Sequence, residues 1–293
     1  MIIRNNFKQK AISSKMKKII LFTLSLFIFS ACNTTKLVYD YGDKYVSWEL
    51  DSYFELNDEQ EDWVEERMKI HLEWHRAQEL PRYKSFLTDI QNSSKDGLTM
   101  SELDEGYSRY EAKQRRTFER LIPDAALFMT KISREQINNL ERKMTEENEE
   151  MLTKVENRQE RIQKRRDDFL EQMEDWFGEF SPGQLAQINQ WQTEWYPESD
   201  DPIERRMKYR LKSQTQLLSL LRSTPDNLAL EKWLFRWISR WDSNENFERK
   251  ARILQNKKRI LQVDKFITSE QRLQAIRELD DWVEILEQVI VNH

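Results

Sequence analysis

The sequence predicts an all-helical protein, and its composition gives the reasons. Only five of the 293 residues are Gly and six are Pro, whereas 34% are charged. Turn-rich β folds and phosphate-binding loops need glycine, while abundant Glu, Gln, Arg, Leu and Lys favour helices. Ten tryptophans supply large apolar side chains for a core and argue against disorder. We therefore expect a bundle of about seven to nine helices.

Residues 1–31 have the layout of a secretory signal. They hold six basic residues and no acidic one, and their apolar run from Ile19 to Phe29 is shorter than the roughly 20 residues that span a bilayer. Translation starts at Met1 or at Met16. Removal of this segment leaves 41 of the 47 basic residues against 52 acidic ones, a formal charge of −11. Nucleic acid is therefore not expected as a partner.

The chain has a single cysteine, Cys32, which excludes an intramolecular disulfide or a multi-cysteine metal site. Phe29-Ser30-Ala31-Cys32 resembles a bacterial lipoprotein signal. The resemblance implies that Cys32 becomes the first residue and carries a diacylglyceryl group and an N-acyl chain such as palmitate. Asn33, in place of Asp, implies sorting to the periplasmic side of the outer membrane. The alternative is an ordinary secretory signal with an incidental cysteine.

After Cys32 we expect a short tether over residues 32–36 and a single helical domain over residues 37–293. Its first segment, up to Phe54, has Tyr and Trp side chains at helical spacing, among them Tyr41 and Trp48. Such a stripe packs on a core or rests at a lipid interface, where Tyr and Trp are stable.

Five helix starts share one pattern, in which an apolar residue precedes a Ser, Thr or Asn cap and Gln or Glu follows three residues later. They are Leu56-Asn57-x-x-Gln60, Leu98-Thr99-x-x-Glu102, Ile132-Ser133-x-x-Gln136, Phe180-Ser181-x-x-Gln184 and Ile267-Thr268-x-x-Gln271. Each is a capping box. A weaker start lies at Thr224-Pro225-Asp226-Asn227.

These capping boxes are similar to the Leu-Thr-x-x-Gln motifs of the Spy/CpxP family of periplasmic chaperones and stress sensors. The similarity implies a chaperone or envelope-stress role as an alternative function. Helix initiation alone explains the same residues.

Residues 133–177 lack Pro and Gly and predict one charged helix, roughly 70 Å long. Its apolar stripe is thin, so we expect a partly solvated arm, paired with another helix or with a second copy of the chain. Further along, Trp233, Trp237 and Trp241 follow one another at intervals of four and form a packing seam or a ligand groove.

His71 and His75 lie four residues apart, a spacing that places two metal ligands on one helix face, with Glu79 one turn further as a third. The alternative is a pair of buried, hydrogen-bonded histidines. Glu does not follow His71 directly, so the zinc-protease pattern is absent.

Four further residues of distinctive type lie close to His75 and Glu79 in the sequence: Trp74, Arg76, Pro81 and Tyr83. We expect Pro81 to kink or end the helix and to turn Glu79, Arg76 and Tyr83 toward one another, as a charge-paired structural unit or as a binding site.

Together with Cys32, Leu37-Val38-Tyr39-Asp40, Trp48 and Leu56-Asn57-x-x-Gln60, these residues resemble a family of bacterial lipoproteins of unknown function. That resemblance implies an all-helical outer-membrane lipoprotein and supplies no activity.

No nucleophile elbow, phosphate loop or dinucleotide fingerprint occurs in the sequence, so we expect no enzyme and no cofactor. The leading hypothesis is a lipid-anchored helical protein that interacts with an envelope protein or with its own second copy.

Overall fold

The computed structural model describes residues 31–291 apart from 157, 198–201 and 241–245. The expected signal over residues 1–30 and Trp241 therefore lie outside the described residues. Within them every regular element is helical, and no strand occurs. The elements are α2 (Ala31–Phe54), α3 (Asp58–Trp74), the π-helix η1 (His75–Glu79), α4 (Leu80–Ser93), α5 (Met100–Thr130), α6 (Arg134–Glu156), α7 (Arg158–Phe177), α8 (Pro182–Trp195), α9 (Pro202–Arg222), α10 (Asn227–Ser239), α11 (Phe247–Phe266) and α12 (Ser269–Val291).

Because α3, η1 and α4 run on without interruption, the described residues form ten helices, slightly more than the seven to nine expected. The expected tether over residues 32–36 is part of α2. No helix in the described part of the chain is long and apolar enough to cross a membrane.

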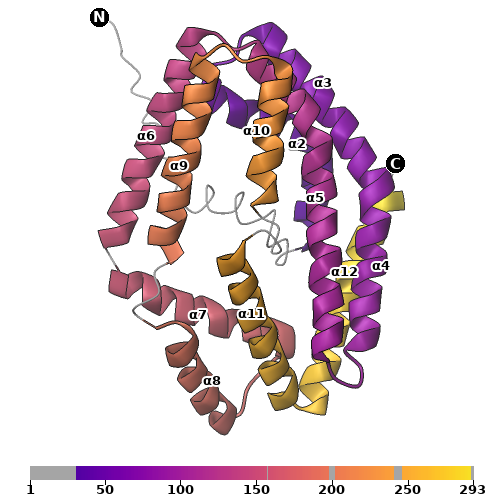
Figure 1. Ribbon diagram of the computed structural model, residues 1–293. Helices are drawn as coiled ribbons and strands as arrows, with labels where there is room; N and C mark the ends of the chain where they lie inside the picture. The colour runs from indigo at the N-terminus through magenta and orange to yellow at the C-terminus, as the bar shows by residue number, and fades with distance from the viewer. Residues whose placement is uncertain (1–30, 157, 198–201, 241–245, 292–293) are drawn as a thin grey trace, which may run out of the picture.

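The expected long helix over residues 133–177 is two helices, α6 and α7, which run in different directions (Figure 1). Each serves a different core: Ile137 and Leu140 of α6 are buried in one cluster, and Met173 of α7 in another. The expectation of a single arm was wrong because the apolar stripe alone does not show that its two halves face different partners. α6 does pair with another helix, α9, as Figure 1 shows.

Three apolar clusters hold the helices together. The first core lies among α2, α3, α5, α6, α9 and α10, and includes Phe54, Ala126 and Leu230. The second core joins α7, α8 and α11 around the stacked rings of Trp191 and Trp195. The third core is formed by Leu80 of α4 with Leu286 and Val289 of α12. Burial of such side chains contributes about 1.5–3 kcal/mol each.

The capping boxes begin their helices as expected, with both hydrogen bonds present in all five. The weaker start differs in register. Asp226, rather than Thr224, caps α10, because its side chain accepts a hydrogen bond from the Ala229 amide. Thr224 has a positive φ of 51° and ends the preceding turn instead.

Candidate functional site

The Trp-His-Arg and Glu-Leu-Pro residues lie on η1 and on its borders with α3 and α4. Pro81 explains this π-helix: it has no N–H to donate, and in an α-helix its ring would collide with the carbonyl four residues earlier. The chain widens one turn, so that the Leu80 amide donates to the His75 carbonyl. Pro81 then falls in the first turn of α4, where no donor is needed. The helix thus continues through Pro81, where the sequence predicts a kink or an end, and the irregular turn lies just before the proline.

The wide turn brings charged residues inside the molecule. Arg76, five residues after the buried His71, is also buried. Glu79 has no exposed surface at all. The Nε of Arg116, on α5, lies 2.6 Å from Oε1 of Glu79. Neither carboxylate oxygen accepts a well-shaped hydrogen bond from any residue that the structure describes. The Arg116 ion pair is therefore the interaction that compensates the buried charge.

His75 faces α2. Its Nδ1 lies 2.6 Å from the hydroxyl of Tyr39, which we assign as the donor because burial lowers the pKa of His75 to about 4 and keeps the ring neutral. Burial likewise raises the pKa of Tyr39, so its hydroxyl keeps the proton. The guanidinium of Arg76 lies 4.9 Å from the centre of the Tyr39 ring. These contacts fix α2 to η1.

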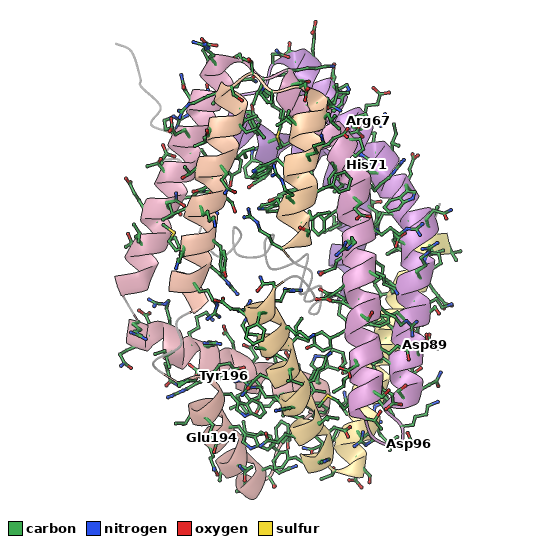
Figure 2. The ribbon with its side chains drawn as sticks, in the orientation of Figure 1. Arg67, His71, Asp89, Asp96, Glu194 and Tyr196 are labelled. Carbon is green, nitrogen blue, oxygen red and sulfur yellow. The ribbon has the colours of Figure 1, made fainter. Side chains whose placement is uncertain are left out.

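His71 faces α5. Its Nε2 lies 2.7 Å from Oδ2 of Asp124, and the same oxygen accepts a hydrogen bond from Arg67 Nε at 2.9 Å. Burial lowers the pKa of His71, and the bond to Asp124 opposes that shift. Figure 2 shows Arg67 and His71 on neighbouring turns of the same helix. This group fixes α3 to α5.

The structure does not bring His71, His75 and Glu79 together as metal ligands, because each is engaged with a different side chain: His71 with Asp124 of α5, His75 with Tyr39 of α2, and Glu79 with Arg116 of α5. Among the described residues, no group of three His, Cys, Asp or Glu side chains is placed to hold a metal ion.

The other motif residues surround the same cluster. The ring of Tyr83 lies 5.9 Å from that of His75, and burial raises the pKa of Tyr83 to about 12. The guanidinium groups of Arg116 and Arg120 make cation–π contacts with the ring of Trp74, at 5.9 and 5.7 Å from its centre. Arg76, Glu79 and Tyr83 thus do not pair with one another as expected. Each instead contacts a residue of a helix outside the motif: Arg76 contacts Tyr39 of α2, Glu79 contacts Arg116 of α5, and Tyr83 is hydrogen-bonded to Thr117 of α5.

Two pairs of capping boxes are joined by their glutamines, a contact that the sequence analysis missed. Gln136 donates to Gln60 Oε1 at 2.7 Å, and Gln184 donates to Gln271 Oε1 at 2.8 Å. In each pair one glutamine also donates to a backbone carbonyl just before the partner motif, Glu55 or Glu179. The repeated Gln at the third helical position was the available signal, because two such side chains can bond reciprocally.

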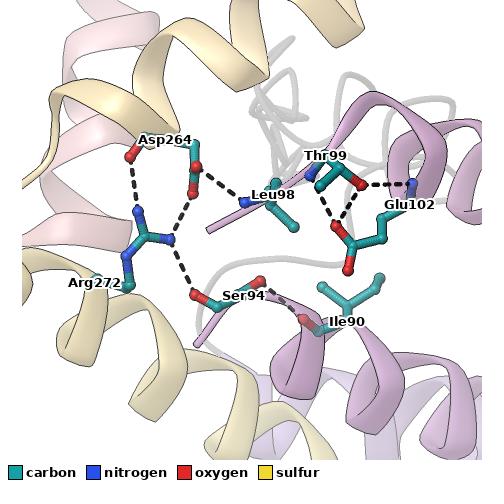
Figure 3. Close-up of polar contacts among 7 residues, drawn as sticks. All are labelled: Ile90, Ser94, Leu98, Thr99, Glu102, Asp264 and Arg272. Atoms are coloured by element: carbon teal, nitrogen blue, oxygen red, sulfur yellow. Dashed lines mark hydrogen bonds and ion pairs between the residues drawn. The ribbon is translucent and has the colours of Figure 1, made fainter. Parts of the chain in front are cut away.

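A separate clasp holds the α4–α5 loop to the α11–α12 turn (Figure 3). Arg272 donates to the Ser94 carbonyl at 2.9 Å and to Asp264 Oδ1 at 2.5 Å, while Asp264 Oδ2 accepts from the Leu98 amide at 3.0 Å. Gly97 permits this approach with a φ of 101°. No local sequence pattern indicates this clasp, because the bonds from Leu98 to Asp264 and from Arg272 to Ser94 join residues 166 and 178 positions apart.

A recess of about 620 Å³ lies between α9 and α10. Its walls combine hydroxyl and amide groups from α9 and the residue after it with a tryptophan and two arginines from α10 and its C-cap: Thr215, Gln216, Ser219, Leu220, Ser223, Trp233, Arg236 and Arg240. Arg240 bridges the two helices through Ser213 and Gln216. Trp233 and Trp237 are stacked and pack on the first core, as the seam interpretation expects, and Trp233 also borders the recess.

Comparison with known families matches residues 52–247 to a family of unknown function, DUF6279. The match covers 196 of the 293 residues and includes Trp74 to Tyr83, but it begins after Cys32 and Trp48. No curated protein and no solved structure matches the chain. The expectation of an uncharacterised family is thus confirmed, and the chain belongs to the family of unknown function DUF6279.

Proposed function

We propose that this protein is a lipid-anchored, non-catalytic interaction protein on the periplasmic side of the outer membrane. The observation that carries the proposal is the position of Cys32 within the first turn of α2. α2 packs on α3, α6 and α12, so an acyl group on Cys32 would hold the whole helical body next to the membrane without a flexible linker. The signal-like segment before Cys32 supports the same placement.

The buried polar cluster around η1 supports a structural rather than a catalytic role for the motif. His75, Glu79 and Arg76 are enclosed between helices, and each faces a side chain from α2 or α5. A catalytic acid or base must reach a substrate within hydrogen-bond distance. These groups instead fix the relative positions of α2, α3 and α5.

The recess between α9 and α10 is the surface that we assign to the partner, an envelope protein. Trp233 with Arg236 offers the residue types that dominate binding energy in protein interfaces. Ser219 and Thr215 add hydroxyl groups for hydrogen bonds at the opposite wall.

Photo-crosslinking in intact cells tests this assignment. A crosslinking amino acid at Ser219 should give one adduct of discrete mass, and the same substitution at the exposed Gln190 of α8 should not. Arg236→Glu should abolish the Ser219 adduct. The proposal is contradicted if Ser219 and Gln190 give the same adducts, or none.

The chaperone alternative is favoured by one observation, the two glutamine-bonded pairs of motifs that are similar to those of the Spy/CpxP family. It requires that the folded chain from Cys32 to His293 slow the aggregation of a denatured client at equimolar ratio. An unchanged aggregation rate would remove this alternative.

A further inference from the structure

The outward face of α2 carries large apolar side chains that no helix covers. Leu37, Tyr41 and Trp48 are 52%, 57% and 56% exposed. With 100° per residue, these three and Lys44 lie within about 60° of one another around the helix axis, and they span roughly 16 Å along it. They form a continuous stripe, which we call the α2 stripe.

The opposite face of α2 is fully used in packing. Asp43 and Ser47 are buried, and Phe54 belongs to the first core. Gly42 lies so close to α3 that an added Cβ would meet Leu72 Cδ1 at 3.2 Å. The orientation of α2 is therefore fixed, and the α2 stripe cannot turn inward.

We infer that the α2 stripe lies on the surface of a zwitterionic lipid bilayer. Cys32 is in the same helix, about 7.5 Å along the axis before Leu37 and about 24 Å before Trp48. A helix that begins at an acylated residue has its first turns within reach of the headgroups. This inference rests on the proposed lipid anchor and adds the face that the anchored protein presents to the membrane.

The residue types fit this occupant. Tyr and Trp are enriched where a bilayer meets water, since each ring has an apolar body and a polar tip. Lys44 lies within the α2 stripe and is exposed, and its long stem can extend along the surface while the ammonium stays in water.

Charge decides between lipid surfaces. The exposed Asp40 and Asp51 border the α2 stripe, and the chain from Cys32 onward has a formal charge of −11. An anionic surface would repel these groups, whereas a zwitterionic one would not. The apolar stripe is too small to bind a bilayer firmly alone, so it contributes through the high local concentration that the anchor provides.

The test uses tethering that is independent of cellular lipidation. The chain from Cys32 to His293 is coupled through its single thiol to maleimide-bearing lipid in phosphatidylcholine vesicles. It contains all the helices that the structure describes, and only the first residue of α2, Ala31, is missing from it. Phosphatidylcholine brominated on the upper part of its acyl chains then quenches tryptophans that lie at the boundary between headgroups and acyl chains. Because Trp48 is one of ten tryptophans, we expect quenching of about one tenth of the emission. Trp48→Phe should abolish it, and Trp233→Phe should leave it unchanged.

A double variant of the stripe, Leu37→Ser with Tyr41→Ser, should reduce the Trp48 quenching at least threefold. Phe247→Ser is the matched control, since Phe247 is 85% exposed but lies on α11. Both variants change exposed side chains, and circular dichroism verifies that they fold. If Trp48 is not quenched, or if Phe247→Ser has the same effect as the double variant, the inference is wrong. A Trp48 that is shielded by a second copy would show as a dimer in sedimentation and would also overturn it. None of these results depends on whether cells acylate Cys32.

Discussion

The ion pair between Glu79 and Arg116 makes a sharp prediction, because its two partners differ in exposure. Glu79 has no exposed surface, while the side chain of Arg116 is 42% exposed. Arg116→Ala leaves a buried carboxylate without its cation, and such losses cost about 3–5 kcal/mol of unfolding free energy. Glu79→Gln leaves an arginine that water can solvate, so we expect a cost of only about 1–2 kcal/mol.

The assay is urea unfolding at pH 7, followed by tryptophan fluorescence and circular dichroism. Glu79→Gln introduced into Arg116→Ala should recover at least about 1 kcal/mol, because it removes the uncompensated charge. Arg142→Ala serves as the control: its ion pairs with Glu55 and Glu146 are exposed, and its loss should cost less than about 1 kcal/mol. If Arg116→Ala is no more harmful than Arg142→Ala, or if Glu79→Gln gives no recovery, the buried pair does not hold η1 in place.

Further predictions concern acidity, the glutamine pairs and two glycines. Because folding lowers the pKa of His75 from its ordinary value of 6.5 to about 4, its contribution to stability is present above pH 6.5 and is lost as the pH falls toward 4. Between pH 6.5 and 5 this loss is about 2 kcal/mol, and urea titrations should show that His75→Asn lacks it. Gln136→Ala should lower the free energy of unfolding by about 2–3 kcal/mol. The control Glu102→Ala, in an exposed capping box outside the glutamine pairs, should lower it by only about 1 kcal/mol. Equal costs would contradict a stabilising role of the glutamine pair. Gly97→Ala should lower the melting temperature and cost about 1–2 kcal/mol of unfolding free energy, because φ at this position is 101°. Gly106→Ala, in the interior of α5, should raise the melting temperature and add about 0.5–1 kcal/mol.

Local signals predicted local structure well. The helical class and all five capping boxes follow from composition and from residues within four positions of each other, and the structure contains them. Helix count and helix continuity depend on tertiary packing. α6 and α7 separate because Ile137 and Met173 belong to different cores, which a one-dimensional pattern does not show.

The candidate site shows the same limit. The sequence groups Trp74 to Tyr83 and predicts a kink or an end of the helix at Pro81, whereas the structure has a π-helix just before Pro81. It did not show that a π-helix would bury Glu79 or that Arg116 would be its partner, since that partner comes from a helix more than thirty residues away. Likewise, His71 and His75 have the spacing of metal ligands. In the structure, however, Nε2 of His71 contacts Asp124 and Nδ1 of His75 contacts Tyr39.

The anchor at Cys32 is the central claim, and mass analysis of the mature N-terminus with membrane fractionation tests it most directly. We predict that the wild-type protein begins at Cys32, carries the mass of a diacylglyceryl group and an N-acyl chain, and sediments with outer membranes. Cys32→Ser should retain the unprocessed signal and lack the lipid mass. A wild-type protein that is found in the soluble fraction, or that begins at another residue without added lipid, would contradict the account.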